Sequence, residues 1–161
     1  LVNIVKQRTN KPKVDIIAHS MGGLVARRYL QIFGEEDINR LIMIAVPNKG
    51  ISAETSTYCR IVGESRECKD MQENSLFINK LNDPSRYPKK VKLYTVTGQG
   101  CSTKQGDSDG IVLSENTKLE NAQAYHINGT CGLFGETLHT DILDIEKYPK
   151  TYEMIKDILK E

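Results

Sequence analysis

The pattern of apolar positions in the first third of the chain predicts a strand, a helix and a second strand in direct succession. Residues 13–20 form a short apolar run rich in β-branched side chains, which is typical of a buried strand. Apolar residues then recur at helical spacing over 22–34, and Gly34 ends that pattern. A second apolar run, over 38–47, is closed by Pro47. This succession is the βαβ unit of a parallel sheet.

The helix predicted over 22–34 has an apolar stripe that should face the sheet. Val25, Tyr29 and either Ile32 or Phe33 lie on one side at the 3.6-residue period, so we expect them to be buried.

The rest of the chain repeats the alternation after an interruption. Residues 91–100 and 122–129 predict a third and a fourth strand, and 148–161 predicts a helix that packs on the sheet. The first eleven residues have the pattern of an amphipathic helix stopped by Pro12, as expected of a chain that begins in the middle of a fold.

Residues 48–90 form a polar segment that is too long for an ordinary connection in a small domain. It carries one apolar helical piece, over 75–84. Long insertions of this kind usually serve as caps or lids, although a surface excursion without a function is the alternative. We therefore interpret 1–161 as one domain with a cap-like or lid-like insertion at 48–90.

Length and charge change this picture little. The chain has 161 residues, enough for one domain, and a net charge of +1, which gives no reason to expect nucleic acid as a partner. The longest apolar run, 41–46, is too short to cross a bilayer.

The four cysteines indicate the cellular compartment in which the protein works. Their number is even and their spacing is not that of a zinc site, which favours two disulfides in a secreted or extracellular protein. The most economical pairing is Cys59–Cys68 with Cys101–Cys131, although three pairings are open. Free thiols in a cytoplasmic protein are the alternative.

Residues 16–23, "IIAHSMGG", place Ser20 between the first strand and the helix. A turn this sharp brings neighbouring backbones together, so the residues two before and two after, Ala18 and Gly22, should need to be small. It also strains Ser20 and exposes its hydroxyl at the carboxyl end of the sheet, as in a nucleophile elbow. The N–H of Met21, at the start of the helix, is then a candidate oxyanion donor.

A serine nucleophile needs a base and an acid. In folds that carry a nucleophile elbow, the order of these residues along the chain is serine, acid, histidine. We favour His139, in the loop after the fourth strand, as the base, because His126 lies within that strand and has a structural interpretation. We favour Asp109 as the acid, with Asp107 of the same loop in reserve. His19 is interpreted as a packing residue of the elbow.

The segment "VDIIAHSMGGLVARRYL" resembles the nucleophile region of α/β-hydrolase lipases, in particular bacterial "AHSMGG" lipases, class 2 lipases and deacylase-like enzymes. Four further segments are similar to family features in the same order: "LIMIAVPNKGIS" to a strand and turn, "NSLFINKLN" to a cap segment, "SDGIV" to the acid loop and "LHTDIL" to the histidine loop. The resemblance implies an α/β-hydrolase fold with a mostly parallel sheet and helices on both faces.

The resemblance also implies roles: Ser20 as nucleophile, Asp109 as acid, His139 as base and Met21 as oxyanion donor. The family's first strands and their "HG" loop, which gives a second oxyanion donor, have no counterpart before Ser20. The chain thus resembles the C-terminal two-thirds of the fold, and we expect an N-terminal segment of the same precursor to complete the sheet and the oxyanion hole.

The expected activity is hydrolysis of an acyl ester or lipid, with transient contact with a lipid surface and without a cofactor or metal. The same site would serve a thioesterase, an acyltransferase or a lipid-glycan deacylase. A non-catalytic binding module on a hydrolase scaffold is the alternative from another class.

Overall fold

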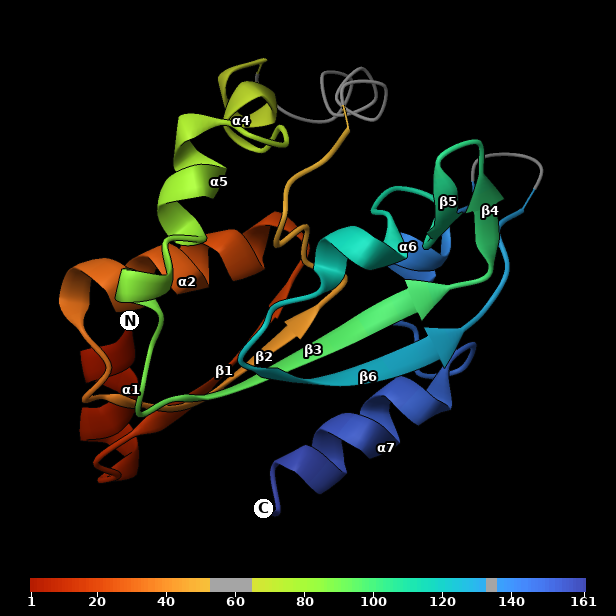
Figure 1. Cartoon of the computed structure of the whole chain (residues 1–161). Helices are drawn as coiled ribbons and strands as arrows, with labels where there is room; N and C mark the ends of the chain where they lie inside the picture. The colour runs from red at the N-terminus through yellow and green to blue at the C-terminus, as the bar shows by residue number, and fades with distance from the viewer. Residues whose placement is uncertain (53–64, 133–135) are drawn as a thin grey trace.

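The computed structural model describes residues 1–52, 65–132 and 136–161 as a parallel sheet with helices on both faces (Figure 1). The strands of this sheet are β1 (Val14–His19), β2 (Ile38–Ile44), β3 (Lys92–Gln99) and β6 (Ala122–Asn128). Their order is β1-β2-β3-β6, and every neighbouring pair is parallel. The predicted parallel sheet is therefore confirmed.

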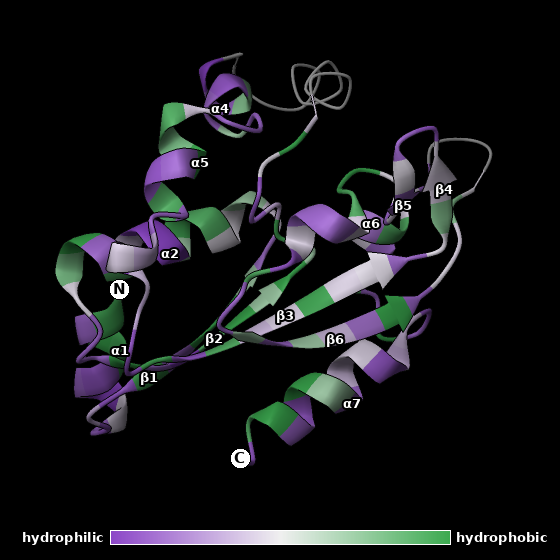
Figure 2. Cartoon of the chain, viewed as in Figure 1, coloured by the Kyte–Doolittle hydropathy of each residue, from purple (hydrophilic) through white to green (hydrophobic). Residues whose placement is uncertain are grey.

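The two long helices lie on opposite faces of this sheet. Figure 1 shows α2 (Met21–Phe33) on one face and α7 (Pro149–Ile158) on the other. Each face has its own apolar core, so β2 is buried on both sides and reads as a continuous apolar run (Figure 2). The remaining long element of the N-terminal part, α1 (Val2–Thr9), contacts β1.

The buried face of α2 differs from the predicted one. Val25, Ile32 and Phe33 are 60%, 56% and 71% exposed, so the prediction of an apolar stripe was wrong at these positions. The residues of α2 that are buried are Gly23, Leu24, Ala26, Arg27 and Leu30. Apolar periodicity missed this face because a glycine and an arginine belong to it.

Gly23 explains how α2 approaches the sheet. A Cβ at this position would lie 2.2 Å from Cγ2 of Val46, just after β2, which is closer than real contacts allow. The absence of a side chain lets the first turn of the helix pack directly on the sheet.

Arg27, buried in the same face, joins α2 to the segment after β2. Its guanidinium donates hydrogen bonds to the side-chain oxygens of Asn48 (3.1 Å) and Asn82 (2.8 Å) and to the carbonyl of Leu81 (2.9 Å). Burial lowers the pKa of Arg27 to about 10, so the group still carries its charge at neutral pH.

The predicted insertion is described in part. It contains α4 (Ser65–Asp70), which the sequence pattern did not predict, α5 (Leu76–Leu81) within the predicted helical piece, and the 3-10 turn η1 (Pro84–Arg86). Residues 53–64 lie outside the described residues. Figure 1 shows α4 and α5 standing beyond α2, away from the sheet, which is where a cap would lie.

Small elements that the sequence analysis missed follow β3. They are an antiparallel hairpin of β4 (Cys101–Thr103) and β5 (Gly106–Ser108), the 3-10 turn η2 (Ser114–Thr117) and the one-turn helix α6 (Leu138–Asp141). Each is too short to give a periodic pattern. Within the described ranges, no helix is both long and apolar enough to span a membrane.

Candidate active site

Ser20 occupies the corner between β1 and α2. β1 ends at His19 and α2 begins at Met21, so a single residue makes the turn. Ser20 has φ 51° and ψ −134°, a conformation that a residue with a side chain rarely adopts and that costs roughly 1–3 kcal/mol. Its N–H donates to the carbonyl of Ile44 at 2.9 Å, which ties the strained corner to the end of β2.

The steric reason expected for Gly22 was wrong. Outside the backbone of its own helix, a Cβ built at Gly22 would meet no atom of the described residues within 4 Å, whereas one at Gly23 would collide with Val46. The crowding at this corner therefore lies one residue further along the helix, where the helix meets β2.

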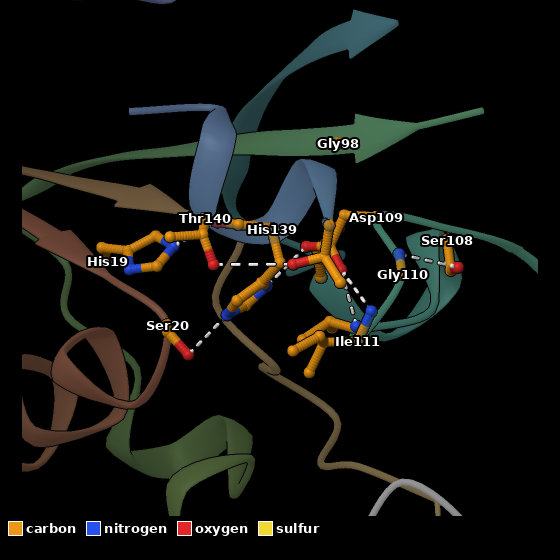
Figure 3. Close-up of polar contacts among 12 residues, drawn as sticks. His19, Ser20, Gly98, Ser108, Asp109, Gly110, Ile111, His139 and Thr140 are labelled. Carbon is orange, nitrogen blue, oxygen red and sulfur yellow. Dashed lines mark hydrogen bonds and ion pairs between the residues drawn. The ribbon is translucent and has the colours of Figure 1, made fainter. Parts of the chain in front are cut away.

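A chain of hydrogen bonds joins Ser20 to a buried carboxylate (Figure 3). The Ser20 hydroxyl lies 2.9 Å from Nε2 of His139, and Nδ1 of His139 lies 2.7 Å from Oδ2 of Asp109. The carboxylate can only accept, so Nδ1 carries the hydrogen, and Nε2 is left to accept from the serine. The structure thus brings together the serine, the histidine and the acid that the sequence analysis favoured.

Asp109 is fully buried, and its surroundings hold it as an acceptor. Oδ1 receives the backbone N–H groups of Ile111 (2.9 Å) and Val112 (2.7 Å), which leaves Oδ2 for the histidine. Gly98 of β3 makes room for this carboxyl, because a Cβ there would lie 2.7 Å from Cβ of Asp109. A buried carboxylate with three donors is oriented to one direction.

The alternative residues lie in other surroundings. Asp107 accepts from the N–H of Gly100 (2.8 Å) and from the hydroxyl of Ser114 (2.9 Å), so its carboxylate braces the acid loop. His126 is exposed on β6. Met21, the first residue of α2, has an N–H that no acceptor of its own helix can reach.

His19 has a contact that the sequence analysis missed. Its Nε2 lies 2.7 Å from the main-chain carbonyl oxygen of His139, and the two rings are 4.8 Å apart between centroids. Its position beside Ser20 was a signal that this residue could reach the site, but the partner comes from 120 residues later.

A disulfide lies beside the loop that carries Asp109. Cys101 and Cys131 are bonded, which confirms that predicted pair. Sγ of Cys131 lies 3.6 Å from the carbonyl oxygen of Asp109, and the carbonyl of Cys101 accepts from the hydroxyl of Ser108. The bond therefore braces the segment that carries Asp109. Of the other predicted pair, Cys68 is disulfide-bonded and Cys59 lies outside the described residues.

Removing this disulfide should lower stability. We expect the double variant Cys101→Ala with Cys131→Ala to lose about 3 kcal/mol of unfolding free energy, because the bond closes a loop with a sequence separation of 30 residues. Urea denaturation measures this loss, and Ser102→Ala, a change at an exposed residue of the same hairpin, is the control. An unchanged urea midpoint in the double variant would show that the bond does not stabilise the fold.

The described residues contain no group of three or more His, Cys, Asp or Glu side chains that could hold a metal ion. The arrangement of Ser20, His139 and Asp109 is one in which a histidine and a carboxylate can activate a hydroxyl.

The parallel sheet and the strand–serine–helix corner define an α/β hydrolase. A family model describes the protein further: the lipase (class 2) model matches residues 1–131. The chain belongs to this family, and with it to the carboxylic ester hydrolases. His139 lies beyond the matched range, so its place beside Ser20 rests on the structure alone.

Solved structures have the same fold at low sequence identity. The mature lipase BlEst2 from Bacillus licheniformis is similar with a TM-score of 0.74 and 18% identity, over 98% of this chain and 69% of that one. The esterase EaEST from Exiguobacterium antarcticum has a TM-score of 0.51 and 15% identity, over 98% and 70%. Phospholipase PlaB from Legionella pneumophila in complex with thio-NAD has a TM-score of 0.58 and 16% identity, over 98% of this chain and 48% of that one. A comparison with curated proteins finds no match.

Proposed function

We propose that the protein is a serine hydrolase that cleaves carboxylic esters, as a lipase or an esterase does, through an acyl-enzyme on Ser20. The observation that carries this proposal is the continuous hydrogen-bond chain from the Ser20 hydroxyl through His139 to buried Asp109. Family membership supports the ester class, and the strained backbone of Ser20 supports its role as the nucleophile.

Each residue has a defined step in this mechanism. Nε2 of His139 accepts the Ser20 proton while Oγ attacks the acyl carbonyl carbon, and Asp109 stabilises the imidazolium that forms. The N–H of Met21 donates to the developing oxyanion. His139 then protonates the leaving alcohol, and a water molecule repeats the sequence to release the acid and restore Ser20.

An N-terminal segment of the same precursor is the partner we propose for the open edge of the sheet. Among the described residues β1 is one of the two edge strands of this sheet, and Ile17 on it is 49% exposed. The helices α1 and α2 contact β1 and carry exposed apolar side chains, namely Ile4 on α1 and Met21 and Val25 on α2, and Leu1 before α1 is exposed as well. A further strand there would cover them and carry the second oxyanion donor.

We propose that the cap-like segment over 48–90 shapes the substrate pocket and makes transient contact with lipid. Leu76 on α5, which is 90% exposed, is a candidate contact.

We also propose that the protein is secreted. The disulfide between Cys101 and Cys131 favours this compartment, because such bonds persist in oxidising surroundings.

A covalent probe tests the proposed function. We expect a fluorophosphonate to label full-length protein on Ser20 alone, and 4-nitrophenyl ester hydrolysis to stop in proportion to labelling, because only an activated serine reacts with both. Heat-unfolded protein is the control and should stay unlabelled. A folded protein that neither reacts with the probe nor hydrolyses esters would favour the binding-module alternative.

A substrate panel separates the related activities. Comparing matched esters, thioesters, lipids and acylated glycans by kcat/KM assigns the acyl chemistry. A preference for the thioester or the glycan would replace the ester assignment while keeping the same residues.

A further inference from the structure

We propose that His19 is a positioning residue for the base: its imidazole holds the main chain of His139 so that the His139 ring stays within reach of Ser20. This inference rests on the proposed function of Ser20 and His139, and it gives a role to the residue directly before the nucleophile.

The geometry of the contact defines its direction. Nε2 of His19 lies 2.7 Å from the carbonyl oxygen of His139. Figure 3 shows the His19 ring on the side of His139 that is also close to Ser20. A carbonyl can only accept, so Nε2 of His19 carries the hydrogen and donates it. A single ring nitrogen therefore links the last residue of β1 to the backbone of α6.

Apart from the Ser20 hydroxyl, which contacts the His139 ring, the other restraints on His139 described above come from a different part of the chain. The N–H of His139 donates to the carbonyl of Asp109 at 2.9 Å, and its Nδ1 donates to the carboxylate of the same residue. Both of these contacts come from the acid loop, which reaches the rest of the site through β3. The bond from His19 comes instead from the strand that carries the nucleophile, so it fixes the base relative to Ser20 directly.

The charge of His19 suits this role. The ring is half-buried, and this burial is the main cause that lowers the pKa of His19; the nearby His139 ring lowers it further. The carbonyl of His139 and the Asp109 carboxylate act in the opposite direction. Because the net pKa is lowered, the imidazole stays uncharged at a lower pH than a free histidine would. An uncharged donor holds the backbone without opposing the positive charge that His139 acquires during acyl transfer.

A neutral N–H donor at the same distance along the side chain should therefore replace His19. Glutamine carries its amide nitrogen at the ε position, as histidine does, whereas phenylalanine keeps a ring without a donor. The comparison of His19→Gln with His19→Phe separates the hydrogen bond from packing, and His19→Ala removes both.

The test measures ester hydrolysis by full-length protein. We expect His19→Ala and His19→Phe to lower kcat roughly 10- to 100-fold with KM changed less than about twofold, because a small displacement of the base slows proton transfer without altering binding. His19→Gln should recover most of kcat. His126→Ala, a change at an exposed histidine on β6, should leave kcat unchanged.

The outcomes separate this inference from the proposed function. If wild-type protein is not labelled on Ser20, the proposed function fails. If it is labelled and all three variants of His19 hydrolyse esters at the wild-type rate, or if Gln is no better than Phe, the positioning role is wrong. Thermal unfolding of each variant is measured alongside, and the comparison of Gln with Phe remains decisive where His19→Ala fails to fold.

Discussion

Ser20→Ala is expected to lower kcat for ester hydrolysis by about 10⁴- to 10⁶-fold, because the proposed acyl-enzyme cannot form without the Ser20 hydroxyl and the residual rate comes from binding and oxyanion contacts. The variant should remain folded, since the hydroxyl of Ser20 bonds only to His139 among the residues that the structure describes. Steady-state kinetics with a 4-nitrophenyl ester and the loss of fluorophosphonate labelling measure the effect.

Ser20→Gly is the matched control for the backbone at this position. Both variants lack the nucleophile and should be equally inactive, but glycine adopts a positive φ without strain, whereas alanine retains the strain at φ 51°. We therefore expect Ser20→Gly to be more stable than Ser20→Ala by about 1 kcal/mol in urea denaturation.

The two variants also test different parts of the proposal. Substantial hydrolysis by either one would exclude Ser20 as the nucleophile. Equal stability of the two would instead show that the corner stores no strain, and would leave the assignment of the nucleophile to the kinetics.

The parallel sheet was predictable because its central strands, β2 and β3, are buried on both faces. Burial of this kind selects apolar runs, such as the one within 38–47, which are plain in the sequence. The inner face of α2 was not predictable in the same way. Gly23 belongs to that face because only a residue without a side chain fits against Val46. Arg27 belongs to it because its guanidinium donates hydrogen bonds to Asn48 and Asn82. Neither residue has an apolar side chain that a periodic pattern could detect.

The candidate site was predictable where local chemistry determines it. The small residues around Ser20 and the order serine, acid, histidine pointed to residues that the structure places in contact. The contact of His19 with the carbonyl of His139 was not predictable, because it joins side chain to backbone over 120 residues and leaves no pattern in the sequence. The hydrogen bonds that Asp107 accepts from Gly100 and Ser114 were not predictable for a similar reason. Neither partner has an apolar side chain, so no periodic pattern in the sequence indicates them.

Asp109→Asn is expected to lower kcat by about 10⁴-fold while keeping the fold, because it reverses the hydrogen-bond direction at His139. The amide oxygen can still accept from the N–H groups of Ile111 and Val112, where Oδ1 lies now. The amide nitrogen then faces Nδ1 of His139 and donates to it. The histidine hydrogen moves to Nε2, which can no longer accept the proton of Ser20.

Asp107→Asn provides the matched control, since both aspartates lie in one loop and either could have been the acid. An amide at 107 keeps an acceptor for the N–H of Gly100 and meets a hydroxyl at Ser114 that can accept as well as donate. We expect kcat to change less than about threefold there, since loop bracing away from the reacting atoms acts weakly on the transition state. Kinetics of the two variants at equal fractions folded decide the assignment. A larger loss in Asp107→Asn than in Asp109→Asn would transfer the role of the acid to Asp107.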